Sequence, residues 1–353
     1  MWKFLCCSEQ QINLKIVLDC GQSFRWSKKV DDPSVWLGVL DKKLWLLRQS
    51  LDGIEYKVFD NTAGPCYDNN SDKFAVNNLN NNHADNEKFL CDYFQLDIDV
   101  PSLYEKWSSA DENFKGLQNQ FCGIRMLRQD PVENLFSFIC SQNNNIVRIK
   151  QLVNKLCITY GQKAVCYQDV DYYSFPSLSA LAQPGVEKKL RELGFGYRAK
   201  FIQETAACID QKAKGEEWLY NLRNVPYKEA HQDLCSLPGV GAKVADCVCL
   251  MSLDKSEAIP VDTHMWQIAS RDYLPHLKKN KTLTDKTYKE IGDFFRELYG
   301  NYAGWAHSVL FSADLKKFQE LKTVEASLKP IQKRSKVGRK QGRSNEVKKR
   351  KKK

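Results

Sequence analysis

One amine and one carboxylate lie beside a glycine hairpin in the stretch from residue 237 to residue 264. Lys243 follows Gly239 and Gly241, and Asp262 ends the rigid run Pro260-Val261-Asp262. An unprotonated lysine is a nucleophile toward an electrophilic carbon such as the anomeric carbon of a sugar. A fixed carboxylate can stabilise a developing oxocarbenium ion or take part in proton transfer. The stretch therefore predicts nucleophilic chemistry with an electrostatic or acid/base helper.

The hairpin, Leu237-Pro238-Gly239-Val240-Gly241, suits a contact with a phosphate. Glycines two positions apart let the backbone N–H groups of residues 239–241 approach an anion without a Cβ in the way. A helix expected from about Ala242 would point its positive end at the same place, which also favours the neutral amine of Lys243. A turn of this composition often does no more than connect two helices, and the hairpin alone leaves both interpretations open.

Each reactive residue also has an ordinary structural interpretation. A lysine in a first helical turn is more often a solvated surface residue. Cys247, four positions after Lys243 and on the same helical face, is either a core residue or part of a site wall. Asp262 is a good N-cap for the helix expected from Thr263, and capping alone would explain it. A sequence pattern that extends beyond these residues is needed to decide between their structural and their chemical interpretation.

The net charge of +10 is unevenly distributed along the chain. Residues 316–353 hold 16 Lys or Arg and 3 Glu, a net of +13, which leaves −3 on residues 1–315. A surface for nucleic acid on the body must therefore be local. The basic tail cannot form a core and is expected to be disordered, acting as a nuclear localisation signal or as a nonspecific DNA contact.

The composition argues against several classes of protein. The chain contains no run of 18 uninterrupted apolar residues and no obvious leader at its start, so we expect an intracellular protein without a membrane span. Thirteen scattered cysteines do not indicate a disulfide framework. No cysteine follows Cys249 and the five histidines are dispersed, so neither an iron–sulfur cluster nor a zinc site is expected.

Strands are expected first along the chain and helices afterwards. Residues 23–26, 35–40, 44–48 and 54–59 are rich in β-branched and aromatic residues, with a turn at Asp41-Lys42. Residues 61–86 hold nine Asn in 26 positions, which indicates a surface insertion. Helical periodicity follows from Lys88, with helix starts at Asp130-Pro131 and Asn143-Asn144-Asn145 and with further helices over 198–209, 284–298 and 305–315.

Together with residues 237–262, three further runs carry a resemblance to a known family. They are Gly21–Trp26 (GQSFRW), Phe136–Asn145 (FSFICSQNNN) and Gly304–Leu315 (GWAHSVLFSADL). The chain closely resembles the eukaryotic 8-oxoguanine DNA glycosylase family of the helix-hairpin-helix Gly/Pro-Asp superfamily over roughly residues 12–315, apart from the Asn-rich insertion. Motifs this long and in this order are far more specific than a glycine pattern.

The resemblance implies an α+β fold. The expected domains are a TBP-like antiparallel β domain over 1–120 with the insertion at 61–86, a two-lobed helical glycosylase domain over 121–315 with the helix-hairpin-helix at about 231–252, and the tail at 316–353. It further implies a monomer that acts on double-stranded DNA in the nucleus, needs no cofactor and functions in base excision repair.

The resemblance also assigns roles to the reactive residues. The lysine matching Lys243 attacks C1′, expels the damaged base and forms a Schiff base that then loses the 3′-phosphate by β-elimination. The aspartate matching Asp262 assists. The residues matching Gly239, Val240, Gly241 and His264 contact DNA phosphates.

Two more groups of residues follow from the resemblance. Because the base must leave the duplex, the vacated space is filled by residues matching Asn143, Arg148, Tyr197 and Arg198, which face the orphaned cytosine or wedge the strand. As isolated residues, Asn143 would be a helix cap and Arg198 a surface helix residue.

The flipped base lies in a pocket formed by residues matching Gly21, Cys247, Met251, His307 and Phe311, in which the Gly21 carbonyl accepts the N7–H that normal guanine lacks.

His307 departs from the family pattern, which has Gln at this position to read the Watson–Crick edge of the base. A Gln amide offers a donor and an acceptor together, whereas a neutral imidazole has them on opposite sides of its ring. We expect retained activity with recognition that is weaker or dependent on pH.

Two other functions compete with this interpretation. One is a glycosylase of the same superfamily for another lesion, although many of those carry a four-cysteine cluster after the hairpin. The other is a non-catalytic helix-hairpin-helix DNA-binding protein, in which Lys243 would form no covalent adduct with DNA.

Overall fold

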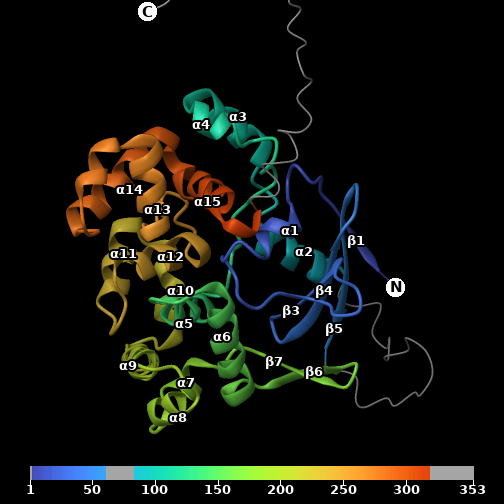
Figure 1. Cartoon of the computed structure of the whole chain (residues 1–353). Coiled ribbons are helices and arrows are strands. Elements are labelled where there is room, and N and C mark those ends of the chain that lie inside the picture. The colour runs from blue at the N-terminus through green and yellow to red at the C-terminus, as the bar shows by residue number, and fades with distance from the viewer. Residues whose placement is uncertain (1, 61–82, 319–353) are drawn as a thin grey trace, which may run out of the picture.

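The computed structural model describes residues 2–60 and 83–318. Its N-terminal part is an antiparallel five-stranded sheet in the order β1-β5-β4-β3-β2 (Figure 1). The strands are β1 (Lys3–Cys6), β2 (Ser27–Lys28), β3 (Val35–Leu40), β4 (Lys43–Gln49) and β5 (Gly53–Phe59). Three of the four expected strands are confirmed, and the turn at Asp41 and Lys42 has the φ angles of +48° and +57° that a tight hairpin requires.

The strand expected at residues 23–26 is wrong. These residues form bends, and only Ser27 and Lys28 pair with β3. The side chains explain the difference, because they reach into different parts of the molecule. Trp26 is buried and donates its indole N–H to Tyr93 at 2.9 Å, whereas Arg25 donates to the Tyr173 carbonyl at 2.6 Å.

The rest of the described chain is mainly helical. The helices are α1 (Leu14–Val17), α2 (His83–Phe94), α3 (Val100–Ala110), α4 (Glu112–Lys115), α5 (Pro131–Ser141), α6 (Ile146–Tyr160), α7 (Leu178–Leu181), α8 (Val186–Glu192), α9 (Arg198–Asp210), α10 (Glu216–Asn221), α11 (Tyr227–Cys235), α12 (Ala242–Ser252), α13 (Thr263–Ile268), α14 (Asp285–Tyr299) and α15 (Ala303–Asp314). Single turns of 3-10 helix occur at Leu222–Asn224, Pro275–Lys279, Gly300–Tyr302 and Lys316–Phe318, and a π-helical turn at Ala269–Tyr273. None of these helices is both long and apolar enough to cross a membrane.

Capping side chains fix the starts of the helices that matter most for the site. Asp130 accepts from the Glu133 N–H at 2.9 Å and starts α5, as expected. Asn145 accepts from the Arg148 N–H at 3.0 Å and starts α6, so the cap in the Asn143-Asn144-Asn145 run is its third member. These bonds satisfy backbone donors that have no partner inside the helix.

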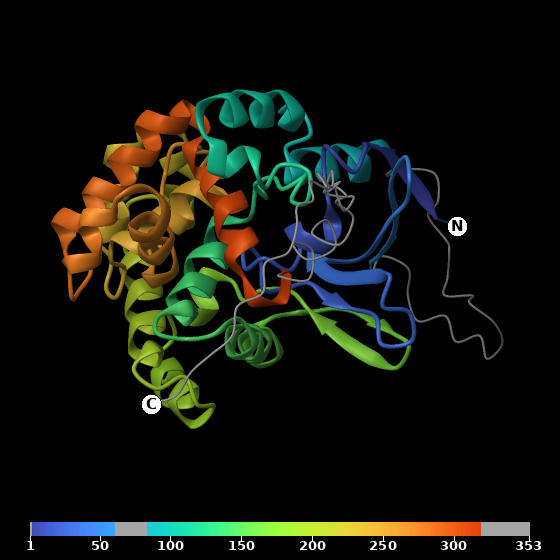
Figure 2. The same ribbon diagram turned by 45° about the horizontal axis from the view of Figure 1, so that its top comes forward.

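Two main hydrophobic cores lie side by side. The sheet packs against α2 around Trp26, Trp45 and Tyr56, and the helical core includes buried side chains of α5, α9, α12 and α15. Side chains of α3 and α4 belong to the helical core. In both orientations α15 lies between the other late helices and the sheet (Figure 1, Figure 2).

A hairpin in the helical half was not expected from the sequence. Strands β6 (Lys163–Tyr167) and β7 (Val170–Tyr173) pair with each other, and Ala164 and Val165 pack against Val35, Leu37 and other residues of β3 and β4 (Figure 1). The hairpin therefore covers part of the sheet and ties the two halves together.

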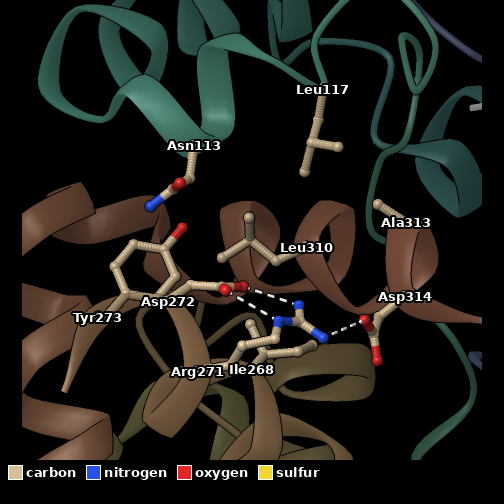
Figure 3. Close-up of a pocket in the computed structure, with 9 residues that line it drawn as sticks. All are labelled: Asn113, Leu117, Ile268, Arg271, Asp272, Tyr273, Leu310, Ala313 and Asp314. Atoms are coloured by element: carbon tan, nitrogen blue, oxygen red, sulfur yellow. Dashed lines mark hydrogen bonds and ion pairs between the residues drawn. The ribbon is translucent and has the colours of Figure 1, made fainter. Parts of the chain in front are cut away.

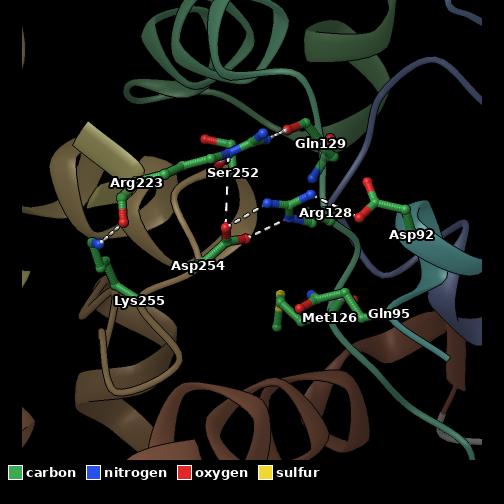
Figure 4. A network of polar contacts seen from close by, with 9 residues as sticks. All are labelled: Asp92, Gln95, Met126, Arg128, Gln129, Arg223, Ser252, Asp254 and Lys255. Atoms are coloured by element: carbon green, nitrogen blue, oxygen red, sulfur yellow. Dashed lines mark hydrogen bonds and ion pairs between the residues drawn. The ribbon is translucent and has the colours of Figure 1, made fainter. Parts of the chain in front are cut away.

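A polar network ties the β half to the end of α12 (Figure 4). The Arg128 guanidinium donates two hydrogen bonds to Asp254, both at 2.8 Å, and one to Asp92 of α2 at 2.7 Å. The next residue, Gln129, donates its backbone N–H to the Met251 carbonyl at 2.8 Å. These contacts fix the last turn of α12, which carries part of the expected base pocket.

Two expected features lie mostly outside the described residues. The insertion was expected at 61–86, of which 61–82 are not described and 83–86 begin α2. Of the tail, only residues 316–318 are described, and there Phe318 is buried against the helical core.

Candidate active site around Lys243

Lys243 lies in the first turn of α12, and its side chain is partly buried. Its Nζ lies 3.4 Å from the Ser141 Oγ and 4.9 Å from the centre of the Phe138 ring, both on α5. The amine therefore emerges from the positive end of one helix over an aromatic face of another. The interpretation as a freely solvated surface lysine does not fit this environment.

Asp262 caps α13, as expected. One carboxylate oxygen, Oδ1, accepts from the Met265 N–H at 2.8 Å. The charges of Asp262 and Lys243 both act on the Cys247 thiol and on the His307 imidazole. The structure thus brings the amine, the carboxylate, the thiol and the imidazole together.

The Cys247 thiol is a buried neutral group in this cluster. Burial raises its pKa to about 11, and the adjacent Lys243 opposes part of that rise. Cys247 is 2% exposed, belongs to the helical core and shares a helical face with Lys243. Met251, one turn further along α12, is also buried.

Helix α15 supplies an aromatic side of the cluster. The His307 ring stacks against the Phe311 ring with centroids 6.2 Å apart, and the exposed His264 ring meets Phe311 edge-on at 5.8 Å. Phe311 thus lies between two imidazoles, one buried on α15 and one on α13.

His307 is the most unusual group here. It is 6% exposed, and neither ring nitrogen makes a hydrogen bond of good geometry with a described residue. Burial lowers its pKa to about 4, while the carboxylate of Asp262 and the Pro260 backbone oppose the shift. The ring is therefore neutral at physiological pH and keeps one donor and one acceptor available.

Gly21 lies in a loop that other residues hold firmly. Its φ is +94°, and a Cβ there would lie 3.3 Å from the Ile146 Cδ1 at the start of α6. The neighbouring Gln22 accepts from the Leu127 N–H and donates to the Arg125 carbonyl, both at 3.0 Å. These contacts explain how a residue far away in sequence keeps a fixed position.

The helix-hairpin-helix is formed by α11, the hairpin and α12. Gly239 has a φ of +73°, and a Cβ there would lie 2.3 Å from the Phe201 ring. The Val240 N–H donates back to the Leu237 carbonyl at 3.1 Å, whereas the N–H groups of Gly239 and Gly241 donate no backbone hydrogen bond within the described ranges. Of the three hairpin amides expected to contact phosphates, these two have no backbone acceptor among the described residues.

The residues expected to face the orphaned base gather at the break between α5 and α6. Asn143 is exposed with a φ of +45°, and Tyr197 is 46% exposed with its hydroxyl 3.2 Å from the Gln142 carbonyl. Arg148 is also exposed and lies 3.4 Å from the Gly194 carbonyl.

Arg198 differs from the surface residue that its helix position suggested. It is 6% exposed and donates to the Gln142 carbonyl, at 3.0 Å from its Nε, and to the Asn143 carbonyl at 3.1 Å. In this arrangement its side chain holds the backbone that presents Asn143. The interpretation of Asn143 as a helix cap is also wrong, because Asn145 caps α6.

Three residues of the site were not singled out from the sequence. Phe138 and Ser141 flank the amine, and Gln142 donates to the Gly239 carbonyl, which links the α5 terminus to the hairpin. All three stand in the run 136–145, and Phe138 and Ser141 are three positions apart on one helix. Their helical spacing was the available signal.

A separate cavity of about 170 Å³ is lined by residues of α13, α15 and the turn after α13, together with Asn113 and Leu117 (Figure 3). Arg271 crosses it and donates to Asp272 at 2.7 and 2.8 Å and to Asp314 at 2.9 Å. Leu310 of α15 and Ile268 of α13 line its floor. None of the expected site residues lines it, and the bond from Arg271 to Asp314 links the turn after α13 to the end of α15.

Comparison with known proteins places both halves of the chain. Residues 4–135 match the family "8-oxoguanine DNA glycosylase, N-terminal domain", and residues 136–293 match the "HhH-GPD superfamily base excision DNA repair protein". The chain is 38% identical to the N-glycosylase/DNA lyase OGG1 of Arabidopsis thaliana, over 89% of this chain and 80% of that protein. It is 37% identical to the N-glycosylase/DNA lyase of Saccharomyces cerevisiae, over 88% and 85%.

A solved structure agrees with these matches. The 8-oxoguanine glycosylase/lyase of Clostridium acetobutylicum, in complex with double-stranded DNA containing cytosine opposite 8-oxoG, superposes with a TM-score of 0.70. It is 30% identical to this chain and covers 86% of it, and the match spans 91% of the bacterial chain.

We predict that Gly239→Ala will lower the free energy of unfolding by about 1–3 kcal/mol, because it combines a positive φ with a clash against Phe201. Gly241→Ala is the matched control, since its φ is −94° and no heavy atom lies within 4 Å of an added Cβ. Because Gly241 is the N-cap of α12, where glycine is favoured over alanine, Gly241→Ala should lower the free energy of unfolding by at most about 1 kcal/mol. Urea denaturation measures both, and equal losses would contradict the described hairpin.

Proposed function

The chain belongs to the 8-oxoguanine DNA glycosylases of the HhH-GPD superfamily, and we propose that it excises 8-oxoguanine from duplex DNA and then cleaves the abasic strand. It is a DNA N-glycosylase and abasic-site lyase of base excision repair. The observation that carries the proposal is the Lys243 amine, which lies at the start of α12 over the Phe138 ring and beside Cys247, a thiol on which the Asp262 carboxylate also acts.

One amine performs both reactions. The Nζ of Lys243 attacks C1′, and the electron pair of the breaking C1′–N9 bond leaves with the base, which takes up a proton. Asp262 stabilises the positive charge that develops on the sugar. After the sugar ring opens, the Schiff base acidifies the C2′ proton, and loss of that proton expels the 3′-phosphate by β-elimination.

The flipped base occupies the space among Cys247, Met251, His307 and Phe311, with its N7–H toward the Gly21 carbonyl. For normal guanine this carbonyl would face a lone pair, and a lost bond with an unpaired buried acceptor costs about 1–3 kcal/mol. That amount alone does not exclude the excess of normal guanine. The neutral Cys247 beside Lys243 adds a second, dipolar discrimination. Ring-opened formamidopyrimidine purines, which keep an N–H donor there, fit the same pocket.

The break between α5 and α6 fills the space that the base vacates. Asn143 and Arg148 bond the orphaned cytosine, and Tyr197 wedges the strand. The bonds from Arg198 to the carbonyls of Gln142 and Asn143 support this assignment, because they preorganise the loop before DNA binds. The Gly239 and Gly241 amides and His264 bind phosphates. The enzyme acts in the nucleus as a monomer, and its basic tail directs import or adds a nonspecific DNA contact.

The Lys243 amine is expected to be essential for both reactions. Lys243→Gln should abolish both base excision and borohydride trapping on a duplex that contains 8-oxoguanine, because the amide cannot form the imine. Lys228→Gln, the same change on an exposed lysine of α11, is the control and should leave trapping intact. Excision without a trapped adduct in the wild type, or an adduct on the Lys243→Gln variant, would contradict the assignment.

The enzyme is expected to prefer cytosine as the base opposite 8-oxoguanine. On duplexes with 8-oxoguanine opposite each of the four bases, single-turnover excision should be fastest opposite cytosine. Arg148→Ala should reduce this preference by about 5–100-fold, since one good base contact contributes about 1–3 kcal/mol. A uniform loss opposite all four bases would instead make Arg148 a phosphate contact.

His307 is expected to weaken recognition of the oxidised base at every pH near neutrality. Because its pKa lies near 4, the imidazole stays neutral at neutral pH, which supports weaker recognition rather than pH-dependent recognition. His307→Gln should tighten binding of the oxidised base, and the ratio of variant to wild-type affinity should stay constant from about pH 6 to about pH 8. Binding titrations at several pH values measure this ratio. An unchanged affinity, or a ratio that drifts severalfold over this range, would contradict the prediction.

A further inference from the structure

A buried carboxylate on the catalytic helix takes no part in the chemistry described above. Asp246 lies three residues after Lys243 on α12 and is 1% exposed. Its Oδ1 accepts from the Tyr227 hydroxyl of α11 at 2.6 Å, and its Oδ2 accepts from the Tyr288 hydroxyl of α14 at 2.5 Å. The His231 Nε2 lies 3.7 Å from Oδ1.

The Tyr288 hydroxyl has a second bond that points toward the active site. Its oxygen accepts from the Val261 backbone N–H at 3.3 Å. Val261 is 1% exposed, and Pro260 before it has no N–H to donate. The Tyr288 oxygen is thus the hydrogen-bond partner through which the backbone immediately before Asp262 is held.

The bonds of this hydroxyl to Asp246 and Val261 depend on each other, and the oxygen also lies 3.4 Å from a second acceptor, the Ile259 carbonyl. A phenolic O–H rotates to suit its surroundings and can both donate and accept. The carboxylate of Asp246 fixes the proton on its own side, so a lone pair of the oxygen remains for Val261.

Asp262 is therefore restrained from both directions. On its C-terminal side, its carbonyl accepts from the Trp266 N–H at 2.9 Å and its Oδ1 accepts from the Met265 N–H at 2.8 Å. On its N-terminal side, the bond between Val261 and Tyr288 sets the backbone. Removal of either restraint lets the carboxylate move relative to the Lys243 amine.

We infer that Tyr288 is a positioning residue for Asp262, and that Asp246 orients the Tyr288 hydroxyl for this task. The inference rests on the proposed function, since it assumes that Asp262 assists the attack of Lys243. Tyr227 bonds the same carboxylate but makes no contact with Val261 among the hydrogen bonds of the described residues. The two tyrosines thus allow the positioning role to be separated from a general contribution to stability.

The experiment compares Tyr288→Phe with Tyr227→Phe. Each removes one hydroxyl from Asp246 and keeps the ring. Tyr288→Phe should slow single-turnover excision of 8-oxoguanine about 10-fold or more, because a small misplacement of a catalytic group is costly. The dissociation constant for the same duplex should stay within about twofold. Tyr227→Phe should leave the excision rate within about twofold even where it lowers the thermal midpoint.

A double mutant separates positioning from a structural effect. In the Asp262→Asn background the residue to be positioned has lost its charge, so adding Tyr288→Phe should slow excision no further. Equal losses from the two tyrosine variants, or an additional loss of about 10-fold in the Asp262→Asn background, would overturn the inference. If Tyr288→Phe does not fold, Asp246→Asn tests the same link, and an unchanged excision rate in that variant would overturn it.

Borohydride trapping of the wild type separates a failure of the proposed function from a failure of the positioning role. A wild type that yields no adduct on borohydride treatment refutes the proposed function itself. A wild type that is trapped, together with a Tyr288→Phe variant that excises at the wild-type rate, refutes only the positioning role.

Discussion

The burial of α12 is the constraint on which the rest of the site depends. All its residues from Val244 to Ser252 are buried, so the helix is surrounded by packing partners on α5 and α11. Only its first turn opens outward, where Lys243 and the hairpin stand. A helix held on every side cannot rotate or slide, and its one reactive amine keeps a fixed direction toward Phe138 and Ser141. Close packing also explains the glycine in the hairpin, because the Phe201 ring occupies the space that a Cβ of residue 239 would need.

Two groups of the site are kept neutral by burial. Burial raises the pKa of the Cys247 thiol and lowers the pKa of the His307 imidazole. Both shifts have the same cause, the cost of placing a charge away from water. As walls of the proposed base pocket, these two side chains therefore present dipoles rather than charges. Such walls suit a neutral base beside a reaction that develops positive charge on a sugar.

Backbone hydrogen bonds from side chains hold the parts of the site that regular structure does not. Arg198 bonds the carbonyls at the break between α5 and α6, Gln22 fixes the loop that contains Gly21, and Tyr288 bonds the backbone before Asp262. Each of these segments is irregular, so its peptide groups find no partners within a helix or a sheet. Gly21, Asn143 and Asp262 stand in or beside such segments, whereas Lys243 stands on a regular helix.

Local patterns predicted three of the five strands of the sheet, most of the helices and Lys243 and Asp262 as a candidate pair, because alternation, helical period and capping residues are local properties of the chain. Asp41-Lys42, Asp130 and Asp262 behave as their local patterns predict. Other features depend on contacts between residues that are far apart in the sequence. The run 23–26 has strand composition, yet Arg25 and Trp26 are drawn to distant partners and no strand forms. Arg198 has the position of a surface residue, yet it is buried on two carbonyls. Asp246 and Tyr288 are 42 residues apart, and their meeting depends on how α14 packs against α12, which no local pattern encodes.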